Sequence, residues 1–296
     1  MGMISKCPPI PSLLLLTVSL LLRLHLISAA DNTNLVYKGC AEQKLEDPSG
    51  IYSQNLQALM TSLVGQSGQK PFSSTTSGDN QNAIMGLYQC RGDLTNSDCY
   101  NCVSKIPNLL DKLCGKVAAA RVQLVGCNMR YEIVGFKQIP ETQLLYRVCG
   151  KKVKGSELEE RRETAFGMVV SGVKTGGNLF YTGSYQSLYV LGQCEGDLDS
   201  ADCGDCVKSA EDQAKVQCRN SISAQIHLHR CYISYSFYPN GVPRISSSSS
   251  SSESGTGQQH TQKTVALAVG GFAALGFLIA CLLFVKSVFR KRSNKY

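Results

Sequence analysis

Cysteine is the residue type of this chain whose spacing carries most chemistry, because thiols form disulfides, bind metals or exchange electrons. Fourteen cysteines occur in the 296 residues. Five of them recur after a displacement of 104 residues, and one earlier cysteine completes each set of six: Cys40, Cys90, Cys99, Cys102, Cys114 and Cys127, then Cys149, Cys194, Cys203, Cys206, Cys218 and Cys231. Flanking residues repeat in the same register, so the sequence predicts two tandem copies of one cysteine-rich module.

The start of the chain has the pattern of a secretory signal peptide. Lys6 precedes an apolar run at residues 13–22, and Ser28-Ala29-Ala30 follows it as a small-residue cleavage site, so residues 1–30 are predicted to be removed. A secreted chain folds in an oxidising compartment, where an even number of cysteines in small modules indicates disulfides. The Cys-x2-Cys pairs of the two modules are accordingly expected to be structural rather than redox-active or metal-binding.

A second apolar segment, residues 264–285, predicts a transmembrane helix, since about 20 helical residues cross a bilayer. Basic residues concentrate in the tail that follows, residues 286–296, which places the C-terminus in the cytosol and makes the chain a single-pass type I membrane protein. A glycolipid-anchor signal is the competing interpretation, with Ser254, Gly255 and Thr256 as its small-residue site. Such signals ordinarily end in apolar residues, whereas this tail ends in basic ones.

Two features of the predicted span concern association and modification. Ala266, Gly270 and Ala274 form a stripe of small residues, the pattern through which membrane helices form homo- or hetero-oligomers, although small residues are common in spans generally. Cys281 lies near the cytosolic boundary and is a candidate for palmitoylation, with an inert thiol as the alternative.

Residues 243–263 are rich in serine and have no apolar periodicity, which predicts a flexible linker between modules and membrane. Its serines either carry O-linked sugar or form an unmodified spacer. No Asn-x-Ser/Thr sequon occurs, so N-glycosylation is not expected.

The net charge of +8 does not indicate a nucleic-acid-binding protein, because the excess lies outside the modules. Residues 31–245 hold 22 basic and 21 acidic side chains, which leaves the modules nearly neutral. The basic tail is a topology signal that also favours anionic lipid at the inner leaflet.

Apolar periodicity predicts the same elements in each module. Residues 52–65 and 157–173 have the stripe of an amphipathic helix, the second of these with Met168 and Gly172 on its apolar side, and a second helix should begin near Ser97 or Asp98 and again near Ser200. Strand-like runs lie at 35–39, 83–89, 120–126 and 128–135, and at 144–148, 187–193, 223–230 and 232–238. The predicted class is α+β, with an antiparallel sheet packed on two helices in residues 31–142 and again in 143–242.

The cysteine pattern carries a family resemblance. Cys-x8-Cys-x2-Cys, followed by cysteines 12 and 13 residues on and preceded by one about 50 residues earlier, resembles the ginkbilobin-type or stress-antifungal domain of plant secreted proteins. Two such domains followed by one span and a short basic tail resemble the plasmodesmata-located proteins. Related receptor-like kinases would continue into a cytosolic kinase, which the eleven residues after the span cannot form.

The cysteines by themselves leave several pairings open in each module. The resemblance implies the pairs Cys40–Cys114, Cys90–Cys99 and Cys102–Cys127, then Cys149–Cys218, Cys194–Cys203 and Cys206–Cys231. Loop entropy then gives roughly 4.5 kcal/mol to the long Cys40–Cys114 bridge and about 2.7 kcal/mol to the short Cys90–Cys99 bridge.

The remaining polar residues do not form a pattern typical of catalysis. His227 and His229 alternate on a predicted strand, a geometry that a metal could use, but no further ligand stands at suitable spacing. A partly exposed strand face is therefore the expectation for both histidines. We predict no metal, no cofactor and no enzymatic activity.

Antifungal members of the resembled domain bind mannose through an Asn, an Arg and a Glu. The matching positions of the first module hold Ala41, Arg121 and Glu132, and the second module, with Gly150, Gln225 and Ser236, matches at none. The lost Asn removes a group that both donates and accepts hydrogen bonds. Arg121 and Glu132 are thus weak candidates for carbohydrate binding, and a cross-strand ion pair between them is the favoured interpretation. Another wall polysaccharide could bind elsewhere.

The resemblance implies a non-enzymatic protein of the plasma membrane at plasmodesmata, which regulates cell-to-cell trafficking, callose deposition and defence through extracellular ligand or wall sensing. It also implies viral movement proteins as candidate partners. Two alternatives are a membrane-held antifungal lectin, and a co-receptor of a receptor-like kinase, because the tail is too short to signal alone.

Overall fold

The structure, a computed structural model, describes residues 31–153 and 157–242. The predicted signal peptide, linker, span and tail lie outside these residues, as does the small-residue stripe of Ala266, Gly270 and Ala274. Within the described ranges, none of the helices combines the length and the apolar character that crossing a membrane requires.

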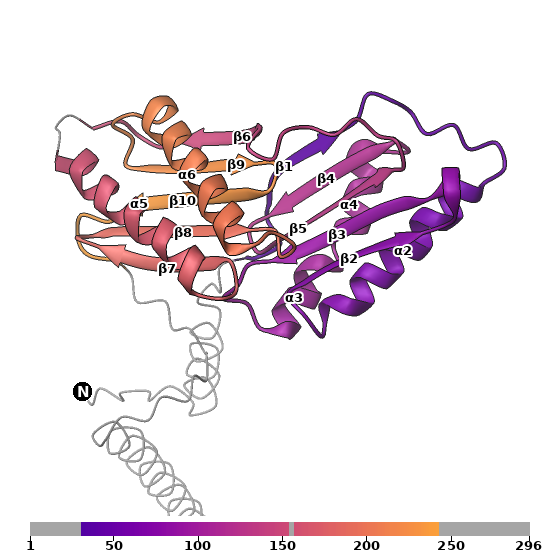
Figure 1. The fold of residues 1–296 in the computed structure, drawn as a ribbon, viewed down its shortest axis with the longest axis horizontal. Coiled ribbons are helices and arrows are strands. Elements are labelled where there is room, and N and C mark those ends of the chain that lie inside the picture. The colour runs from indigo at the N-terminus through magenta and orange to yellow at the C-terminus, as the bar shows by residue number, and fades with distance from the viewer. Residues whose placement is uncertain (1–30, 154–156, 243–296) are drawn as a thin grey trace, which may run out of the picture. The chain divides into compact units, whose positions relative to one another are not determined.

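Each module contains one five-stranded antiparallel sheet, and the two sheets have the same strand order (Figure 1). The first sheet runs β1-β4-β5-β3-β2, formed by β1 (Leu35–Cys40), β2 (Phe72–Ser77), β3 (Ile84–Cys90), β4 (Ala119–Leu124) and β5 (Cys127–Ile133). The second runs β6-β9-β10-β8-β7, formed by β6 (Leu144–Cys149), β7 (Phe180–Tyr185), β8 (Leu188–Cys194), β9 (Ser223–Leu228) and β10 (Cys231–Phe237).

Helices cover one face of each sheet. The first module has α2 (Ile51–Ser67), a short 3₁₀ turn η1 (Asn80–Asn82), α3 (Asn96–Val103) and α4 (Ile106–Cys114). The second module has α5 (Glu157–Thr175) and α6 (Ser200–Gln217), which cross their sheet in Figure 1. The predicted α+β class with two repeated modules is confirmed.

The second helix of the first module differs from its prediction as one continuous element. It is divided into α3 and α4, with Pro107 in the first turn of α4. Proline has no amide hydrogen and clashes with the carbonyl of the residue four positions earlier, here Val103, so the helix cannot run through. The equivalent position of the second module holds Glu211, and α6 is continuous. The N-terminus of α3 is capped by the Thr95 side chain, and that of α6 by the Asp199 side chain.

Strands β2 and β7 were not predicted from the sequence. Their sequences, FSSTTS and FYTGSY, lack an apolar alternation, and both strands lie at sheet edges. A single strand neighbour holds each of them, β3 and β8 respectively. Ser73 of β2 is buried and donates to the Gln66 Oε1 of α2 at 2.6 Å, so tertiary contacts rather than local propensity decide this edge.

The core of each module lies between its helices and its sheet. Leu59 and Leu63 of α2 are fully buried with Ile84 of β3, as the predicted stripe requires. In α5 the buried face is rotated from the prediction: Met168 and Gly172 are only half-buried, and the inward side chains are Leu158, Arg162, Ala165, Phe166, Val169 and Val173.

An arginine in this core explains the rotation of α5. Arg162 is 3% exposed and donates from Nη1 to the Tyr235 hydroxyl at 3.1 Å, and its guanidinium lies near the Tyr235 and Phe166 rings. Apolar periodicity treats arginine as a polar residue and therefore predicts that its side chain faces solvent. Here its hydrogen bonds and ring contacts compensate its burial.

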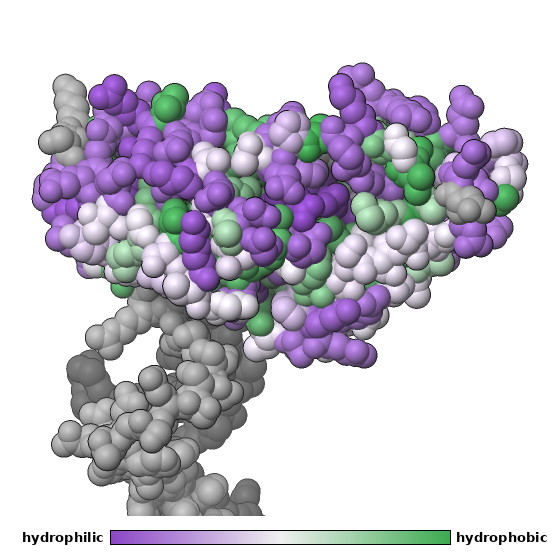
Figure 2. Space-filling model, in the orientation of Figure 1, coloured by the Kyte–Doolittle hydropathy of each residue, from purple (hydrophilic) through white to green (hydrophobic). Residues whose placement is uncertain are grey.

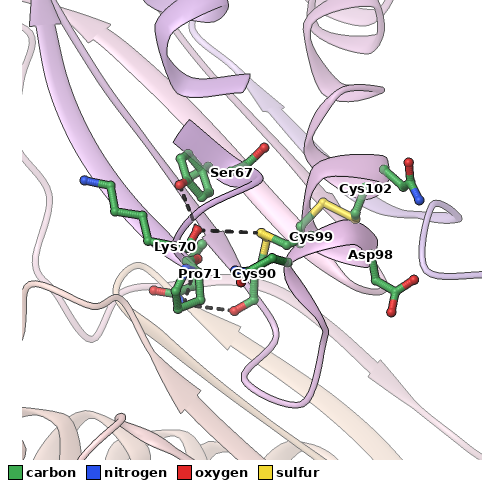
Figure 3. The surroundings of a disulfide bond; sticks show 12 residues. Ser67, Lys70, Pro71, Cys90, Asp98, Cys99 and Cys102 are labelled. Carbon is green, nitrogen blue, oxygen red and sulfur yellow. Dashed lines mark hydrogen bonds between the residues drawn. A yellow bond between two sulfur atoms is a disulfide. The ribbon is translucent and has the colours of Figure 1, made fainter. Parts of the chain in front are cut away.

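Six disulfides link the module cysteines, and their pairs are the six that the family resemblance implies. In Figure 3 the Cys90–Cys99 bridge, which joins the end of β3 to α3, lies beside the chain at Lys70 and Pro71. The Cys90 amide donates to the Pro71 carbonyl at 2.8 Å, and the Tyr88 hydroxyl donates to the Lys70 carbonyl at 2.9 Å. These bonds also secure the residues that lead into edge strand β2.

Removal of the long bridge should impair export more than removal of the short one. Cys40 and Cys114 are 74 positions apart and Cys90 and Cys99 only 9, so loss of the first pair frees more unfolded-chain entropy, about 4.5 against about 2.7 kcal/mol. We expect a full-length fluorescent fusion with both Cys40→Ala and Cys114→Ala to be retained inside the cell more than one with Cys90→Ala and Cys99→Ala. Microscopy checks this, and equal retention would contradict the entropic account.

Candidate functional site: the interface between the modules

The modules meet through the sheet faces that carry no helix. Side chains alternate along a strand, so Val122 and Leu124 of β4 enter the core of the first module while Arg121 and Gln123 point away from it. Arg121 donates from Nη1 to the carbonyl of His229, in the second module, at 2.9 Å. In the reverse direction, Gln193 Nε2 donates to the Cys90 carbonyl at 2.9 Å.

A buried carboxylate joins the two modules. Glu195, whose side chain is 5% exposed, lies 3.0 Å from Arg121 Nη2 and 3.1 Å from Arg130 Nη2, both of the first module. Arg230 of the second module approaches the same carboxylate at 2.9 Å and also pairs with Asp197 at 2.7 Å. We call Arg121, Arg130, Glu195 and Arg230 the ionic cluster. Burial alone would raise the pKa of Glu195, but the three guanidinium groups outweigh it and hold that pKa below its ordinary value.

The predicted ion pair between Arg121 and Glu132 is wrong. The register of β4 and β5 places Arg121 opposite Arg130 and Glu132 opposite Ala119. Glu132 accepts a hydrogen bond from Gln138 Nε2 at 2.9 Å, whereas Arg121 pairs with a residue 74 positions away. The prediction failed because it considered only partners within one sheet.

The three positions that match the mannose-binding residues do line one hollow, of about 280 Å³. Ala41, Arg121 and Glu132 all border it, together with Phe136 and Ile139. The Arg121 guanidinium, however, is engaged by Glu195 and by the His229 carbonyl. Because Ala41 offers no polar group, the first module lacks two of the three interactions that the resembled site would need.

The predicted partly exposed face of His227 is also wrong. His227 is 4% exposed and stacks on Tyr232 with 4.9 Å between ring centroids. Tyr37 of the first module lies against it edge-on at 5.2 Å, and Tyr37 itself stacks on Tyr146 at 5.1 Å. Burial lowers the pKa of His227 to about 3, so the imidazole is neutral and contributes as an aromatic ring. In the described ranges no group of His, Cys, Asp and Glu side chains forms a metal site.

Two glycine–phenylalanine contacts make the interface nearly two-fold symmetric. Gly92 of the first module faces the Phe180 ring, and a Cβ there would lie 2.5 Å from that ring. Gly196, the repeat equivalent of Gly92, faces Phe72 in the same way, at 2.6 Å. Phe72 and Phe180 begin the equivalent strands β2 and β7. Each module thus presents the same patch to the other, as the subunits of a symmetric dimer do.

The charges break this symmetry. The repeat places Arg91 where the second module has Glu195, and it places Gln225 and Ser234 where the first has Arg121 and Arg130. We call the two symmetry-related halves of the interface its arms. The arm that contains Arg121, Arg130 and Glu195 is closed by the ionic cluster. The other arm is an open pocket of about 450 Å³, lined among others by Arg91, Asp93, Tyr189, Gln225, Tyr232 and Ser234. This open pocket is larger than the hollow beside Ala41, Arg121 and Glu132, which measures about 280 Å³.

Comparison with known proteins identifies the modules. A family model described as salt stress response/antifungal matches residues 39–133 and 148–238. Plasmodesmata-located protein 2 of Arabidopsis thaliana is 51% identical over 283 residues, with 91% of each chain covered. Plasmodesmata-located protein 1 of the same plant is 53% identical, with 90% of this chain and 91% of its own covered. The chain belongs to the plasmodesmata-located proteins.

Solved structures of the plasmodesmata-located proteins have the same fold. The tandem ectodomain of the Arabidopsis thaliana receptor-like protein PDLP8 has a TM-score of 0.63 at 29% identity and covers 69% of this chain and 98% of its own. The ectodomain of PDLP5 has a TM-score of 0.60 at 27% identity, with 69% and 100% covered. Both were crystallised as tandem ectodomains, so residues 31–242 are a suitable folding unit for experiments on this member.

Replacement of Glu195 should destabilise the paired modules of this plasmodesmata-located protein. Glu195→Gln leaves the buried guanidinium groups of Arg121 and Arg130 and the half-buried one of Arg230 without the carboxylate that they share, which we expect to cost about 3–5 kcal/mol. Chemical denaturation of residues 31–242 at neutral pH measures this loss. Glu42→Gln, in an exposed loop, is the matched control and should change little.

The same variant tests the pH dependence. Because the folded-state pKa of Glu195 is depressed, its stabilisation is complete above the ordinary value of 4.5 and is lost as the pH falls through the lower folded value. The wild type should therefore lose stability in acid more steeply than Glu195→Gln. Parallel stability curves below about pH 4.5 would show that this charge does not hold the modules together.

Gly196→Ala should also weaken the interface, because the new Cβ meets the Phe72 ring at 2.6 Å. We expect a loss of about 1–3 kcal/mol from overpacking, partly recovered when Phe72→Leu is added. Gly65→Ala is the control, since nothing lies within 4 Å of a Cβ there. Thermal unfolding of residues 31–242 decides the matter, and additive effects of Gly196→Ala and Phe72→Leu would speak against direct contact.

Proposed function

We propose that this protein is a non-enzymatic type I membrane protein of plasmodesmata that regulates cell-to-cell trafficking and callose deposition through extracellular ligand or wall sensing and partner binding. The observation that carries the proposal is its similarity to two plasmodesmata-located proteins, at 51% and 53% identity over about nine-tenths of the chain. That similarity extends beyond the modules into the segments that we predict to be linker and span.

The ectodomain geometry supports a sensor rather than two independent binding modules. The ionic cluster takes Arg121 and Arg130 from one module and Glu195 and Arg230 from the other, so separation of the modules would break the ion pairs of Glu195 with both arginines of the first module. A ligand that contacts both modules would therefore meet a pre-formed surface, which lowers the entropic cost of binding.

The face of the described modules shown in Figure 2 is compatible with an extracellular role. On the face shown in Figure 2, hydrophilic residues cover much of α5 and α6, and hydrophobic residues lie in small separate patches. Large apolar patches ordinarily mark obligate interfaces. We infer that contacts with other membrane proteins are made in part by the predicted span, where the stripe of Ala266, Gly270 and Ala274 would pair helices into a homo- or hetero-oligomer.

We propose that a partner protein transmits the signal of the extracellular modules to the cytosol. A receptor-like kinase that shares the plasma membrane is the candidate class for signalling, and viral movement proteins are candidates for docking at the channel. The alternative of a membrane-held mannose lectin has less support, because Arg121 is engaged in the ionic cluster and Ala41 replaces the family's Asn.

The subcellular location of the protein tests this proposal. We expect a full-length C-terminal fluorescent fusion to form wall puncta that coincide with a callose stain, and residues 263–296 alone, behind a signal peptide, to direct a reporter to the same puncta. The matched control is the reporter with an unrelated span of equal length, which should label the plasma membrane evenly. Even labelling by the full-length fusion would refute the plasmodesmal role.

A further inference from the structure

We propose that the open pocket between the modules binds an uncharged oligosaccharide. Its volume of about 450 Å³ falls in the range of roughly 300–1,000 Å³ that small-molecule sites occupy. The site is separate from the hollow with Ala41, Arg121 and Glu132 and lies on the other arm of the interface. It depends on the fold of the ectodomain and not on the plasmodesmal address, so the two proposals can fail independently.

Comparison of the two arms indicates that the open one is built to receive a ligand. In the closed arm the Glu195 carboxylate of one module inserts between Arg121 and Arg130 of the other. These side chains therefore pair with each other and fill the space between the modules. In the open arm Arg91 occupies the place of Glu195, but it turns to Asp93 of its own module at 2.6 Å. Gln225 and Ser234 of the facing module are therefore left at the wall of a pocket instead of in a contact.

The charge of the pocket favours a neutral ligand. Arg91 pairs through Nε with Asp93 and donates from Nη1 to the Val125 carbonyl at 3.3 Å. The single guanidinium that lines the pocket is thus balanced by the single carboxylate beside it. An anionic ligand would have to compete with Asp93, whereas a neutral one leaves the pair intact.

Hydroxyl groups supply the polar contacts. Ser234, Ser236 and Tyr238 line the pocket, and their side chains form no hydrogen bond with another residue of the described ranges. A hydroxyl both donates and accepts, so a row of them matches a ligand that also presents hydroxyls. Gln225, from the neighbouring strand, adds an amide group, whose Oε1 lies 3.5 Å from His227 Nε2.

Aliphatic side chains and tyrosine rings supply the apolar contacts, and two of the rings are held in place. Tyr232 stacks on His227, and its hydroxyl donates to Gln193 Oε1 at 3.4 Å. The Tyr189 hydroxyl accepts from Thr182 Oγ1 at 2.5 Å. Rings fixed in this way lose little entropy on binding. Rigid tyrosines beside free hydroxyls fit the alternation of C–H faces and hydroxyl edges in a sugar ring.

Isothermal titration calorimetry on residues 31–242 tests the proposal. The probes are neutral tetrasaccharides of β-1,3-linked glucose, β-1,4-linked glucose and β-1,4-linked mannose, with a trimer of galacturonic acid as the anionic comparison. We expect at least one neutral tetrasaccharide to bind and the acidic trimer to bind at least about tenfold more weakly. Failure of all three neutral probes to bind at about 10 mM, or binding of the acidic trimer alone, would overturn the proposal.

A pocket-filling variant locates the binding. Ser234→Leu places a larger side chain in the pocket and should weaken the neutral ligand at least about tenfold. Ser74→Leu makes the same change on an exposed strand position of the first module and should leave binding unchanged. If circular dichroism shows that Ser234→Leu does not fold, Gln225→Ala, which removes only a polar contact, takes its place. Unchanged affinity in the folded pocket variant would overturn the assignment.

Discussion

The Glu195 carboxylate is the interaction on which the paired modules depend. Its charge is buried, and such a charge is tolerated only where opposite charges and hydrogen bonds compensate its lost hydration. The compensation comes from Arg121 and Arg130 of the other module as well as from Arg230 of its own. The modules therefore hold one relative position. That position keeps His227 dry and neutral, places Tyr37 on Tyr146, and leaves the open pocket on the opposite arm.

The interface combines a symmetric frame with asymmetric chemistry. Gly92 with Phe180 and Gly196 with Phe72 repeat the same steric contact, as the two halves of a symmetric dimer interface do. The polar positions around them differ between the copies, because Arg91 stands where the second module has Glu195. The packing contacts are thus the same in both arms. The charged residues differ, so one arm is closed by ion pairs and the other contains the open pocket.

A comparable divergence appears inside the modules. Pro107 interrupts the second helix of the first module, whereas Glu211 keeps α6 continuous. The continuous helix carries an acidic side chain that is only 2% exposed, and burial raises the pKa of Glu211 to about 7 against the opposing effect of Lys208. One substitution at a repeat-equivalent position therefore changes both the helix geometry and the local electrostatics.

The sequence by itself determined the features that depend on local pattern. The cysteine spacing indicated two modules, the apolar periodicity located the long helices and the central strands, and the family resemblance implied the disulfide pairs seen in the structure. Pro107 was visible as well, and its effect on the helix could have been read from the missing amide hydrogen. Except for the disulfide pairs, which the resemblance supplied, these features need only near neighbours in the chain.

Tertiary structure alone decided what the polar residues do. Arg121 pairs with Glu195, 74 residues away, and His227 is buried against the other module. Arg162 lies in the core, although the apolar periodicity predicts a solvent-facing position for a charged side chain. The polar edge strands β2 and β7 exist because a neighbouring strand and a helix hold them. In each case the free energy comes from contacts between distant segments, which composition and spacing do not encode.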